Sequence, residues 1–296
     1  MKKKTLLLTG TTGFIGSKFL LFALSKNFLV IDILRKKNKA NKKIKKLRDL
    51  YPKKYKNIFF SNNNELSKKL KNINADYFIN FATLYNNSHS HNQISDFINS
   101  NILFPSIIYD IMNNKTKKII NFGSMMQHSK NENLVSKNFY AATKNAFEMI
   151  SNYYANINNK TKFYNIKFYE SIGDNDNRKK IIPTLINNYK KNITTKILSK
   201  KLSLNIIHTD DIINSIIILL NNNIKSGSYC IKNSHNIKIN NLIKFLNNHL
   251  EKQIKVKYGN NSTISSQNSN FKILPKWKPV KNLEKKILKI FKNEIN

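Results

Sequence analysis

The sequence predicts an α/β fold built around a parallel sheet. Short apolar strands alternate with amphipathic helical stretches from residue 4 to about residue 165, and this alternation is typical of βαβ units. A turn that holds three of the chain's 7 glycines joins the first strand to the first helix. With 296 residues, the chain is long enough for a large core and a subsidiary lobe.

The first strand is predicted over residues 4–9, and the turn Gly10-Thr11-Thr12-Gly13-Phe14-Ile15-Gly16 follows it directly. An apolar-periodic helix over residues 17–25 comes next, which is the context that a dinucleotide-binding fingerprint requires. Gly10 permits the tight turn, Gly13 lets the backbone approach a pyrophosphate, and Gly16 lets helix and strand pack closely. Free N–H groups at the helix start favour that anion. The alternative is a glycine-rich turn without a ligand, but three glycines at this spacing favour a Rossmann-type doubly wound sheet.

The end of the second strand indicates which dinucleotide is bound. Enzymes that use NAD usually place a carboxylate there, about 20 residues past the glycines, to accept from the ribose 2′-hydroxyl. Counting 18 residues from Gly16 reaches Leu34, with Arg35 and Lys36 after it. These two cations can grip a 2′-phosphate, so NADP is predicted. If the strand ended two residues earlier, Asp32 would take the acidic role and NAD would be the cofactor.

Tyr140 and Lys144 stand four residues apart in a predicted helix and therefore share one face. An ammonium at that place stabilises the phenolate and lowers the tyrosine pKa from about 10 toward neutral pH. A tyrosine with such a pKa can exchange a proton with a sugar hydroxyl or carbonyl. The pair alone is weak evidence in a chain rich in Lys and Tyr. Its position downstream of the glycine turn gives it weight.

Together these motifs resemble the extended short-chain dehydrogenase/reductases that act on nucleotide sugars. Further segments match that family in its order along the chain: a fourth strand at 78–83, a helix asparagine at Asn101, a fifth strand at 121–124, a strand and turn at 167–173, a strand–Asp segment at 207–211, and Trp277-Lys278-Pro279. The resemblance implies a dinucleotide-binding Rossmann domain over 1–165 and a smaller C-terminal α/β substrate-binding lobe over 166–296, with room for chain crossings between the two. It also implies a homodimer.

The resemblance assigns roles to individual residues. Ser124, Tyr140 and Lys144 are the expected catalytic residues: Tyr140 protonates the developing oxyanion at sugar C4, Ser124 donates to it, and Lys144 lowers the Tyr140 pKa and holds the nicotinamide ribose. Ser124 has a plainer alternative as a strand-end cap, and Asp210 with Asp211 is expected to orient the next helix. No metal is predicted. The cofactor is expected to contact Tyr140 and Lys144 together with Gly10, Thr12, Gly13, Phe14, Ile15, Gly16, Arg35, Lys36, Ala82, Thr83 and Asn101, and the substrate Gln127, Arg178 and Lys179.

A narrower resemblance points to one branch of the family. Residues 123–147 and 174–180 are similar to enzymes of deoxysugar synthesis, including CDP-abequose synthase-like 4-ketoreductases, and Ser124 lies 16 residues before Tyr140 as in that branch. Asp174 stands where the family usually has Pro, which leaves the substrate open. The implied function is NADPH-dependent reduction of a 4-keto nucleotide deoxysugar for bacterial surface polysaccharide such as lipopolysaccharide O-antigen. The alternatives are a 4-epimerase with retained NAD and a non-catalytic cofactor-binding or nucleic-acid-associated scaffold.

The net charge of +36 suggests nucleic acid at first sight. Its cations are nearly all lysine, with Arg35, Arg48 and Arg178 as the three arginines, whereas base and phosphate recognition favours arginine. The lysines are spread along the chain among Asn and Ile, a bias typical of A/T-rich codons. We therefore expect no nucleic-acid partner.

Three further features indicate a cytoplasmic protein. No stretch approaches 18 uninterrupted apolar residues, so no membrane span is predicted. The start Met1-Lys2-Lys3-Lys4 resembles a signal peptide, but the apolar run after it is short and leads into the glycine turn. The single cysteine, Cys230, excludes an internal disulfide.

Overall fold

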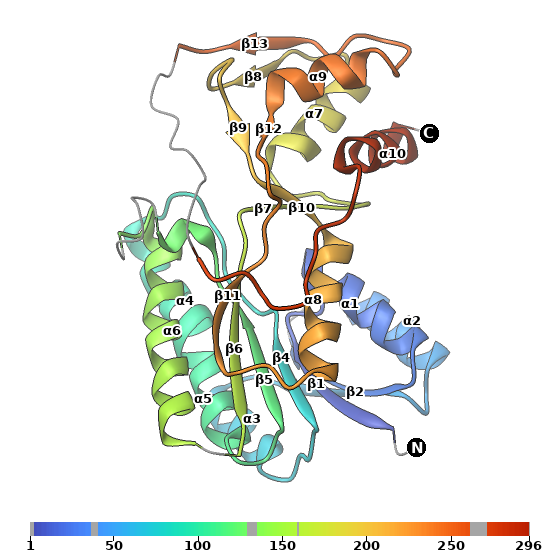
Figure 1. Cartoon of the computed structure of the whole chain (residues 1–296). Coiled ribbons are helices and arrows are strands. Elements are labelled where there is room, and N and C mark those ends of the chain that lie inside the picture. The colour runs from blue at the N-terminus through green and yellow to red at the C-terminus, as the bar shows by residue number, and fades with distance from the viewer. Residues whose placement is uncertain (1–2, 37–40, 129–134, 159, 261–270, 296) are drawn as a thin grey trace. The chain divides into compact units, whose positions relative to one another are not determined.

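The computed structural model describes residues 3–36, 41–128, 135–158, 160–260 and 271–295 (Figure 1). The chain forms two compact units, Met1–Lys167 with Ile216–Tyr229, and Phe168–Ser215 with Cys230–Asn296. The sequence predicted a division after residue 165, with room for chain crossings. In the structure the first unit runs to Lys167 and also contains the later segment Ile216–Tyr229.

The first unit is built on a seven-stranded sheet in the order β11-β6-β5-β4-β1-β2-β3. Each pairing among the strands β1 to β6 is parallel. The order reverses between β1 and β4, as in dinucleotide-binding doubly wound folds, and confirms the predicted fold class. The strands are β1 (Lys4–Thr9), β2 (Phe28–Arg35), β3 (Tyr55–Phe60), β4 (Tyr77–Asn80), β5 (Lys118–Phe122), β6 (Lys162–Lys167) and β11 (Gly227–Cys230).

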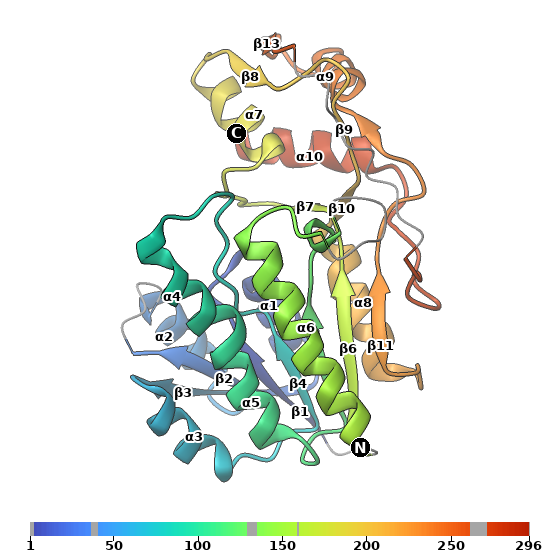
Figure 2. The same ribbon diagram turned by 90° about the vertical axis from the view of Figure 1, so that its left-hand side faces the viewer.

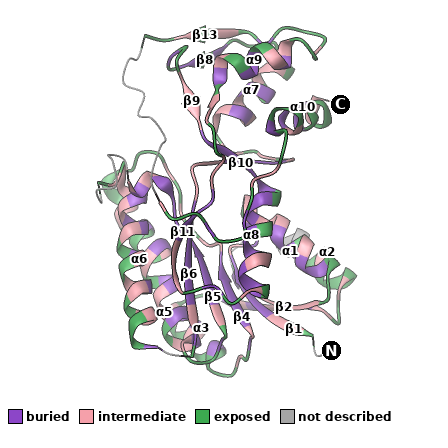
Figure 3. Cartoon of the chain, in the orientation of Figure 1, coloured by how far each residue is buried: buried purple, intermediate pink, exposed green. Residues whose placement is uncertain are grey.

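Helices cover both faces of this sheet, with α5 and α6 on one face and α1 on the other (Figures 1 and 2). Figure 3 shows that the sheet between them is mostly buried. The helices of the unit are α1 (Phe14–Ser25), α2 (Asn41–Leu50), α3 (Asn63–Lys71), α4 (Ile94–Ile98), α5 (Phe104–Met112) and α6 (Phe139–Ile157), with short turns η1 (His91–Gln93), η2 (Asn99–Leu103) and η3 (Met125–Gln127).

The register of the central strands builds two rows of side chains on the face that α5 and α6 cover. Leu7, Phe78, Ile119 and Phe163 are register partners, and all four belong to one buried apolar cluster with residues of α5 and α6. Two positions further along each strand, the partners are Thr9, Asn80, Asn121 and Asn165. The apolar row gives the sheet its core, and the polar row lies just before the carboxyl ends of the strands.

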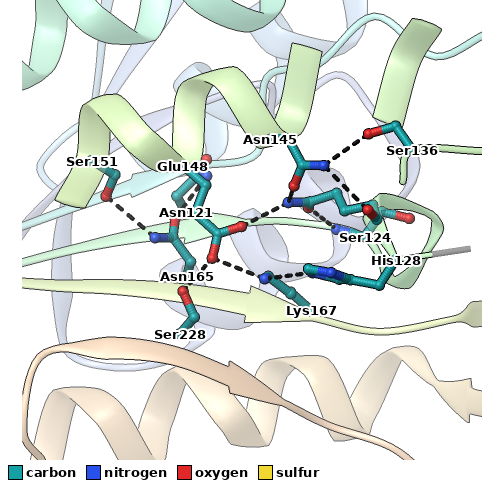
Figure 4. Close-up of polar contacts among 11 residues, drawn as sticks. Asn121, Ser124, His128, Ser136, Asn145, Glu148, Ser151, Asn165, Lys167 and Ser228 are labelled. Atoms are coloured by element: carbon teal, nitrogen blue, oxygen red, sulfur yellow. Dashed lines mark hydrogen bonds and ion pairs between the residues drawn. The ribbon is translucent and has the colours of Figure 1, made fainter. Parts of the chain in front are cut away.

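Hydrogen bonds join the polar row, which we call the amide row, into one chain. The Thr9 hydroxyl donates to Asn80 Oδ1 at 2.6 Å, and Asn80 Nδ2 donates to Asn121 Oδ1 at 3.0 Å. Asn121 Nδ2 donates to Asn165 Oδ1 at 3.1 Å, and Asn165 Nδ2 reaches Ser151 Oγ on α6 at 3.4 Å (Figure 4). All five side chains are buried, so each bond satisfies groups that water does not reach.

The second unit has three short two-stranded sheets and its own apolar core. β7 (Glu170–Ile172) pairs in parallel with β10 (Ile206–His208), β8 (Thr195–Ile197) in parallel with β13 (Val256–Tyr258), and β9 (Ser203–Leu204) antiparallel with β12 (Ile237–Lys238). Buried residues of α7 (Ile181–Lys190), α9 (Ile239–Asn247) and α10 (Leu283–Ile295) form the core. α8 (Thr209–Asn221) has residues in both units.

Asp211 anchors the C-terminal segment to the start of α8. Its carboxylate accepts from the backbone N–H of His208 at 3.0 Å and of Val280 at 2.7 Å, and its carbonyl accepts from Trp277 Nε1 at 3.0 Å. Asp211 therefore orients the helix start, as the sequence predicted. None of the helices in the described part of the chain is long and apolar enough to cross a membrane.

We expect Asn121→Leu to lower the free energy of unfolding by about 2–6 kcal/mol, because the Asn80 amide N–H and the Asn165 carbonyl oxygen would each lose a buried partner at about 1–3 kcal/mol. Urea unfolding followed by circular dichroism measures the change. Asn156→Leu, at an exposed position of α6, is the matched control and should change stability by less than about 0.5 kcal/mol. Equal effects of the two substitutions would show that the amide row contributes nothing special.

Candidate active site

The glycine turn has the geometry that the sequence predicted for a dinucleotide cradle. Gly10 has φ +68°, and a Cβ there would lie 2.4 Å from the backbone nitrogen of Ala82. A Cβ at Gly16 would lie 2.3 Å from the Gly10 carbonyl oxygen. Both positions therefore require glycine for close approach of backbone to backbone. This brings the turn beside the end of β4, where Ala82 and Thr83 were predicted to contact the cofactor.

The start of α1 suits an anion. The helix begins at Phe14, three residues earlier than predicted, because Ser17 N–H already donates to the Gly13 carbonyl at 2.9 Å. Gly13 is the N-cap and makes no side-chain cap hydrogen bond, and a helix start of this kind favours an anion beside its backbone N–H groups. Thr12 and Gly13 are exposed, and Phe14 and Ile15 are half-buried.

Asp32 is sealed beneath the glycine turn. It is fully buried in the middle of β2, and its Oδ2 accepts from the hydroxyls of Thr11 and Tyr55, each at 2.6 Å. Burial raises the Asp32 pKa to about 7. Because β2 continues to Arg35, Asp32 does not stand at the strand end, and the condition under which it would bind a ribose is not met.

Arg35 and Lys36 are both exposed just where β2 ends. Arg35 Nη2 donates to Ser100 Oγ at 3.2 Å, and Lys36 Nζ lies 2.9 Å from a Glu65 carboxylate oxygen. Leu34 before them is buried. The end of the strand therefore presents two cations, and the nearest strand carboxylate, Asp32, lies inside the protein.

Asn101 joins the loop after β4 to the helix that carries Tyr140 and Lys144. It lies in η2, a π-helical turn between α4 and α5, and such wide turns are frequent at functional sites. Its Oδ1 accepts from the Thr83 hydroxyl at 3.1 Å and from Leu84 N–H at 2.7 Å, and its Nδ2 donates to the Leu84 carbonyl and to Thr143 Oγ1. These four bonds use both N–H groups and the oxygen of the Asn101 side-chain amide. Asn101 therefore holds the surrounding loops in place, and its amide has no N–H group left to donate to the predicted cofactor.

The three predicted catalytic residues lie at the end of β5 and the start of α6. Ser124 follows β5 and caps η3, with its Oγ accepting from Met126 N–H at 3.2 Å. That bond uses an acceptor position, which is compatible with the hydroxyl donating elsewhere. Tyr140 stands in the first turn of α6, behind the Asn138 cap. Its ring packs edge-on against Tyr85, with 4.9 Å between centroids.

Lys144 is a buried ammonium one helical turn beyond Tyr140. It is only 4% exposed, and burial lowers its pKa to about 8, against an opposing contribution from the Glu148 carboxylate. The lysine is thus still mainly charged at neutral pH. A positive charge at this place on α6 favours the ionised form of a neighbouring phenol.

Glu148 is the centre of a polar cluster that also contains His128, Lys167 and Ser228 (Figure 4) and the fully buried Gln127. Lys167 is buried too, and Glu148, His128 and Ser228 are half-buried. Its carboxylate accepts from Gln127 Nε2 at 2.7 Å, lies 2.8 Å from Lys167 Nζ, and accepts from the Ser228 hydroxyl. Lys167 Nζ also lies 2.9 Å from His128 Nε2. Burial and Lys167 lower the His128 pKa to about 4, so the neutral ring accepts from the ammonium.

Gln127 was predicted to touch substrate, and the structure places it fully inside the protein. Both N–H positions of its amide are used, by Asn145 and Glu148, and its Oε1 accepts from Ser124 N–H at 2.7 Å. These bonds hold the Ser124 turn and leave no N–H of Gln127 for a ligand. Glu148 was not predicted as a site residue, although its position four residues after Lys144 places it on the same side of the helix.

Arg178 and Lys179, also predicted to bind substrate, line a pocket of about 320 Å³ in the second unit. The Arg178 guanidinium is held by both Asp176 carboxylate oxygens, at 2.8 and 2.7 Å, and by the Ser171 carbonyl at 2.7 Å. Lys179 and Lys190 are further cations of the pocket lining. Arg178 therefore holds the wall of the pocket in place by its bonds to Asp176 and Ser171. Within the described residues, no group of three or more His, Cys, Asp and Glu side chains could hold a metal ion.

Known proteins share both the sequence pattern and the fold. The model of the NAD dependent epimerase/dehydratase family matches residues 6–231. CDP-abequose synthase of Yersinia pseudotuberculosis is 27% identical over 226 residues, which cover 76% of this chain and 75% of that protein.

Solved structures with a similar fold are more distant in sequence. A mutant of UDP-glucuronic acid 4-epimerase from Bacillus cereus, in complex with a UDP-sugar and NAD, superposes with a TM-score of 0.79 at 16% identity and covers 98% of each chain. UDP-N-acetylglucosamine 4-epimerase from Methanobrevibacter ruminantium M1 gives a TM-score of 0.77 at 19% identity, over 99% of this chain and 98% of the other. At these identities the likeness shows the fold.

We expect Gly16→Ala and Gly13→Ala to separate fold from ligand binding. The Gly16 methyl would press on the Gly10 carbonyl, and we expect a loss of about 1–3 kcal/mol in the free energy of unfolding. A Cβ at Gly13 would lie 3.2 Å from the Gly10 carbonyl oxygen, a milder contact, so we expect a smaller loss of stability than in Gly16→Ala, together with weaker dinucleotide binding. Urea unfolding and fluorescence titration with NADPH and NADH measure the two quantities. Equal loss of stability in both variants would contradict the assignment.

Proposed function

This chain belongs to the NAD dependent epimerase/dehydratase family, and we propose that it reduces the 4-keto group of a nucleotide-activated deoxysugar, with NADPH as the reductant. The family model, the abequose synthase relative and the fold all support an enzyme of the extended short-chain type that modifies a nucleotide sugar. The observation that carries the proposal is the buried Lys144 one turn beyond Tyr140, with Ser124 at the end of the neighbouring strand β5.

In this proposal each of the three residues has one task. NADPH bound at the glycine turn supplies the hydride for the sugar carbon. The Tyr140 hydroxyl donates its proton to the C4 oxygen, and Ser124 donates a hydrogen bond to the same oxygen as negative charge develops there. Lys144, still mainly protonated at neutral pH, stabilises the phenolate that Tyr140 becomes. Above about pH 8 Lys144 loses its proton, and that support is lost.

Preference for NADP is supported by the end of β2. Arg35 and Lys36 are exposed there and can bind a 2′-phosphate, whereas Asp32 is sealed beneath the turn by Thr11 and Tyr55. A free strand-end carboxylate, which would repel the phosphate and accept from a ribose hydroxyl, is not offered by the described part of β2. The family as a whole is NAD dependent, so NAD stays the alternative.

A 4-epimerase is the second candidate, because the solved structures of similar fold are nucleotide-sugar 4-epimerases. The same Ser, Tyr and Lys serve both reactions, and the fold does not separate them. An epimerase would keep NAD bound and return the hydride to the opposite face of the sugar. The intact glycine turn and Ser124–Tyr140–Lys144 set argue against a scaffold without catalysis.

The substrate is proposed to be an anionic nucleotide sugar of surface polysaccharide synthesis, such as that of O-antigen. The relative at 27% identity is a CDP-abequose synthase, and the pocket of the second unit brings Lys179 and Lys190 to a polar and apolar lining suited to a nucleotide. The net charge of +36 would speed the encounter with such an anion.

We also propose that the enzyme is a homodimer in the cytoplasm. Met149, Tyr153 and Ile157 follow each other at one-turn intervals on α6 and are 62, 58 and 57% exposed. An exposed apolar stripe of this kind favours a partner helix, and a second copy presents the same stripe. Light scattering should give twice the 34.5 kDa mass of one chain; a monomer at micromolar concentration would refute the dimer.

The cytoplasmic location predicted from the sequence stays part of this proposal.

We expect Tyr140→Phe to lower the rate of sugar reduction by about 10²–10⁴-fold, because it removes the proton donor and leaves the ring packing in place. The assay follows oxidation of NADPH and, in parallel, of NADH with CDP-, dTDP-, UDP- and GDP-4-keto sugars, and NADPH should be the better reductant. Tyr153→Phe on the same helix is the matched control: it removes a hydroxyl from the exposed stripe and keeps the apolar ring that a dimer contact would use, so it should keep full activity.

Two outcomes would contradict this proposal. An unchanged rate in Tyr140→Phe would remove Tyr140 as the acid. Tightly bound NAD in the purified protein, found by mass spectrometry, together with interconversion of C4 epimers and no net use of NADPH, would favour the epimerase.

A further inference from the structure

We infer that Glu148 is a positioning residue of the active site, which ties the Ser124 turn to α6 and keeps Lys144 charged. The inference rests on the proposed function for its catalytic consequences. Glu148 stands four residues after Lys144 and eight after Tyr140, so the three side chains follow one another along one side of α6. It is the point where α6, β6, β11 and the turn after β5 meet.

The first part of the role is mechanical. Ser124 N–H donates to Gln127 Oε1 at 2.7 Å, and Gln127 Nε2 donates to Glu148 Oε2 at 2.7 Å. The Gln127 amide is packed so closely over Gly123 that a Cβ at Gly123 would lie 2.6 Å from Gln127 Oε1. The position of Ser124 relative to the helix of Tyr140 is thus set by the buried Gln127 amide and its two partners on α6, Glu148 and Asn145.

The second part is electrostatic. Among the residues that the structure describes, the charged or titratable groups that face Glu148 are Lys144 from its own helix, Lys167 from the end of β6 and His128 just after η3. Gln127 and Ser228 are neutral partners. Glu148 is therefore a carboxylate that faces two buried ammonium groups, and its removal takes a negative charge from beside both of them.

Glu148→Gln removes the charge and preserves the shape. We expect a fall of at least about tenfold in kcat for reduction. The pKa on the alkaline side of the pH–rate profile should also shift down by about one unit, because an ammonium loses its proton more readily once a nearby carboxylate is gone. Asp110→Asn is the matched control: it removes an exposed carboxylate that accepts from Tyr154 on α6, and it should leave both kcat and the profile unchanged.

Gln127→Leu separates the two parts of the role. It breaks the tie to Ser124 without removing a charge, so we expect kcat to fall while the alkaline pKa stays in place. Hydrogen exchange of the Ser124 and Met126 amides, measured by mass spectrometry on the peptide that ends at His128, should speed up in both Gln127→Leu and Glu148→Gln. Asp110→Asn should not change it.

The exchange measurement needs no substrate, so it decides the mechanical part even if the wild-type enzyme reduces none of the sugars tested. Unchanged exchange in both variants would overturn the tie to Ser124. A lower melting temperature of Glu148→Gln with an unshifted pH profile would overturn the electrostatic part and reduce Glu148 to a residue of the core.

Discussion

The buried amide row is the interaction on which the rest of the first unit depends. Each of its members stands one to three residues before a part of the site: Thr9 before Gly10, Asn80 before the Phe81–Ala82 backbone, Asn121 before Gly123 and Ser124, and Asn165 before Lys167. A slip of one residue in any strand would turn its amide to the other face of the sheet and leave buried partners unsatisfied. The row therefore fixes the four strand ends against one another before any ligand is present.

The carboxylates that matter for the site are held by buried partners and not by ion pairs at the surface. The chain carries 52 basic and 16 acidic side chains, yet two carboxylates organise the polar groups near the strand ends: Asp32 under the glycine turn and Glu148 on α6. Asp32 is held by two hydroxyls, and burial brings its pKa to about 7. Glu148 pairs with Lys167 at 2.8 Å, and its charge opposes the fall in the pKa of Lys144. The excess of lysine at the surface has little part in this arrangement.

Local signals in the sequence were sufficient for the parts of the site that lie within one strand–turn–helix unit. The glycine turn, Ser124 at the end of its strand, and Tyr140 with Lys144 at helical spacing could all be predicted, and the parallel sheet followed from the alternation of strands and helices. The placement of Asp32 depended on where β2 ends, a boundary that the apolar pattern of Phe28–Arg35 does not mark. The Glu148 cluster could not be predicted because it brings together residues from four elements. Gln127 and Arg178 were expected to meet substrate from the family resemblance. The structure uses the amide N–H groups of Gln127 in internal bonds, and it places Arg178 in a pocket lining with Asp176 and Ser171 as partners.

The π-helical turn at Asn99–Leu103 has a consequence for how this protein can change over generations. A π turn holds one residue more than an α turn, so a deletion inside it can be absorbed by an ordinary helix that still presents Phe104 to the core, where its ring stacks on Phe60. Asn101 would then rotate away from Thr83 and Thr143, and the loops of the site would lose their common anchor. A deletion in this turn would therefore remove the Asn101 contacts and keep the packing of Phe104. Such a change would disable the site without unfolding the protein.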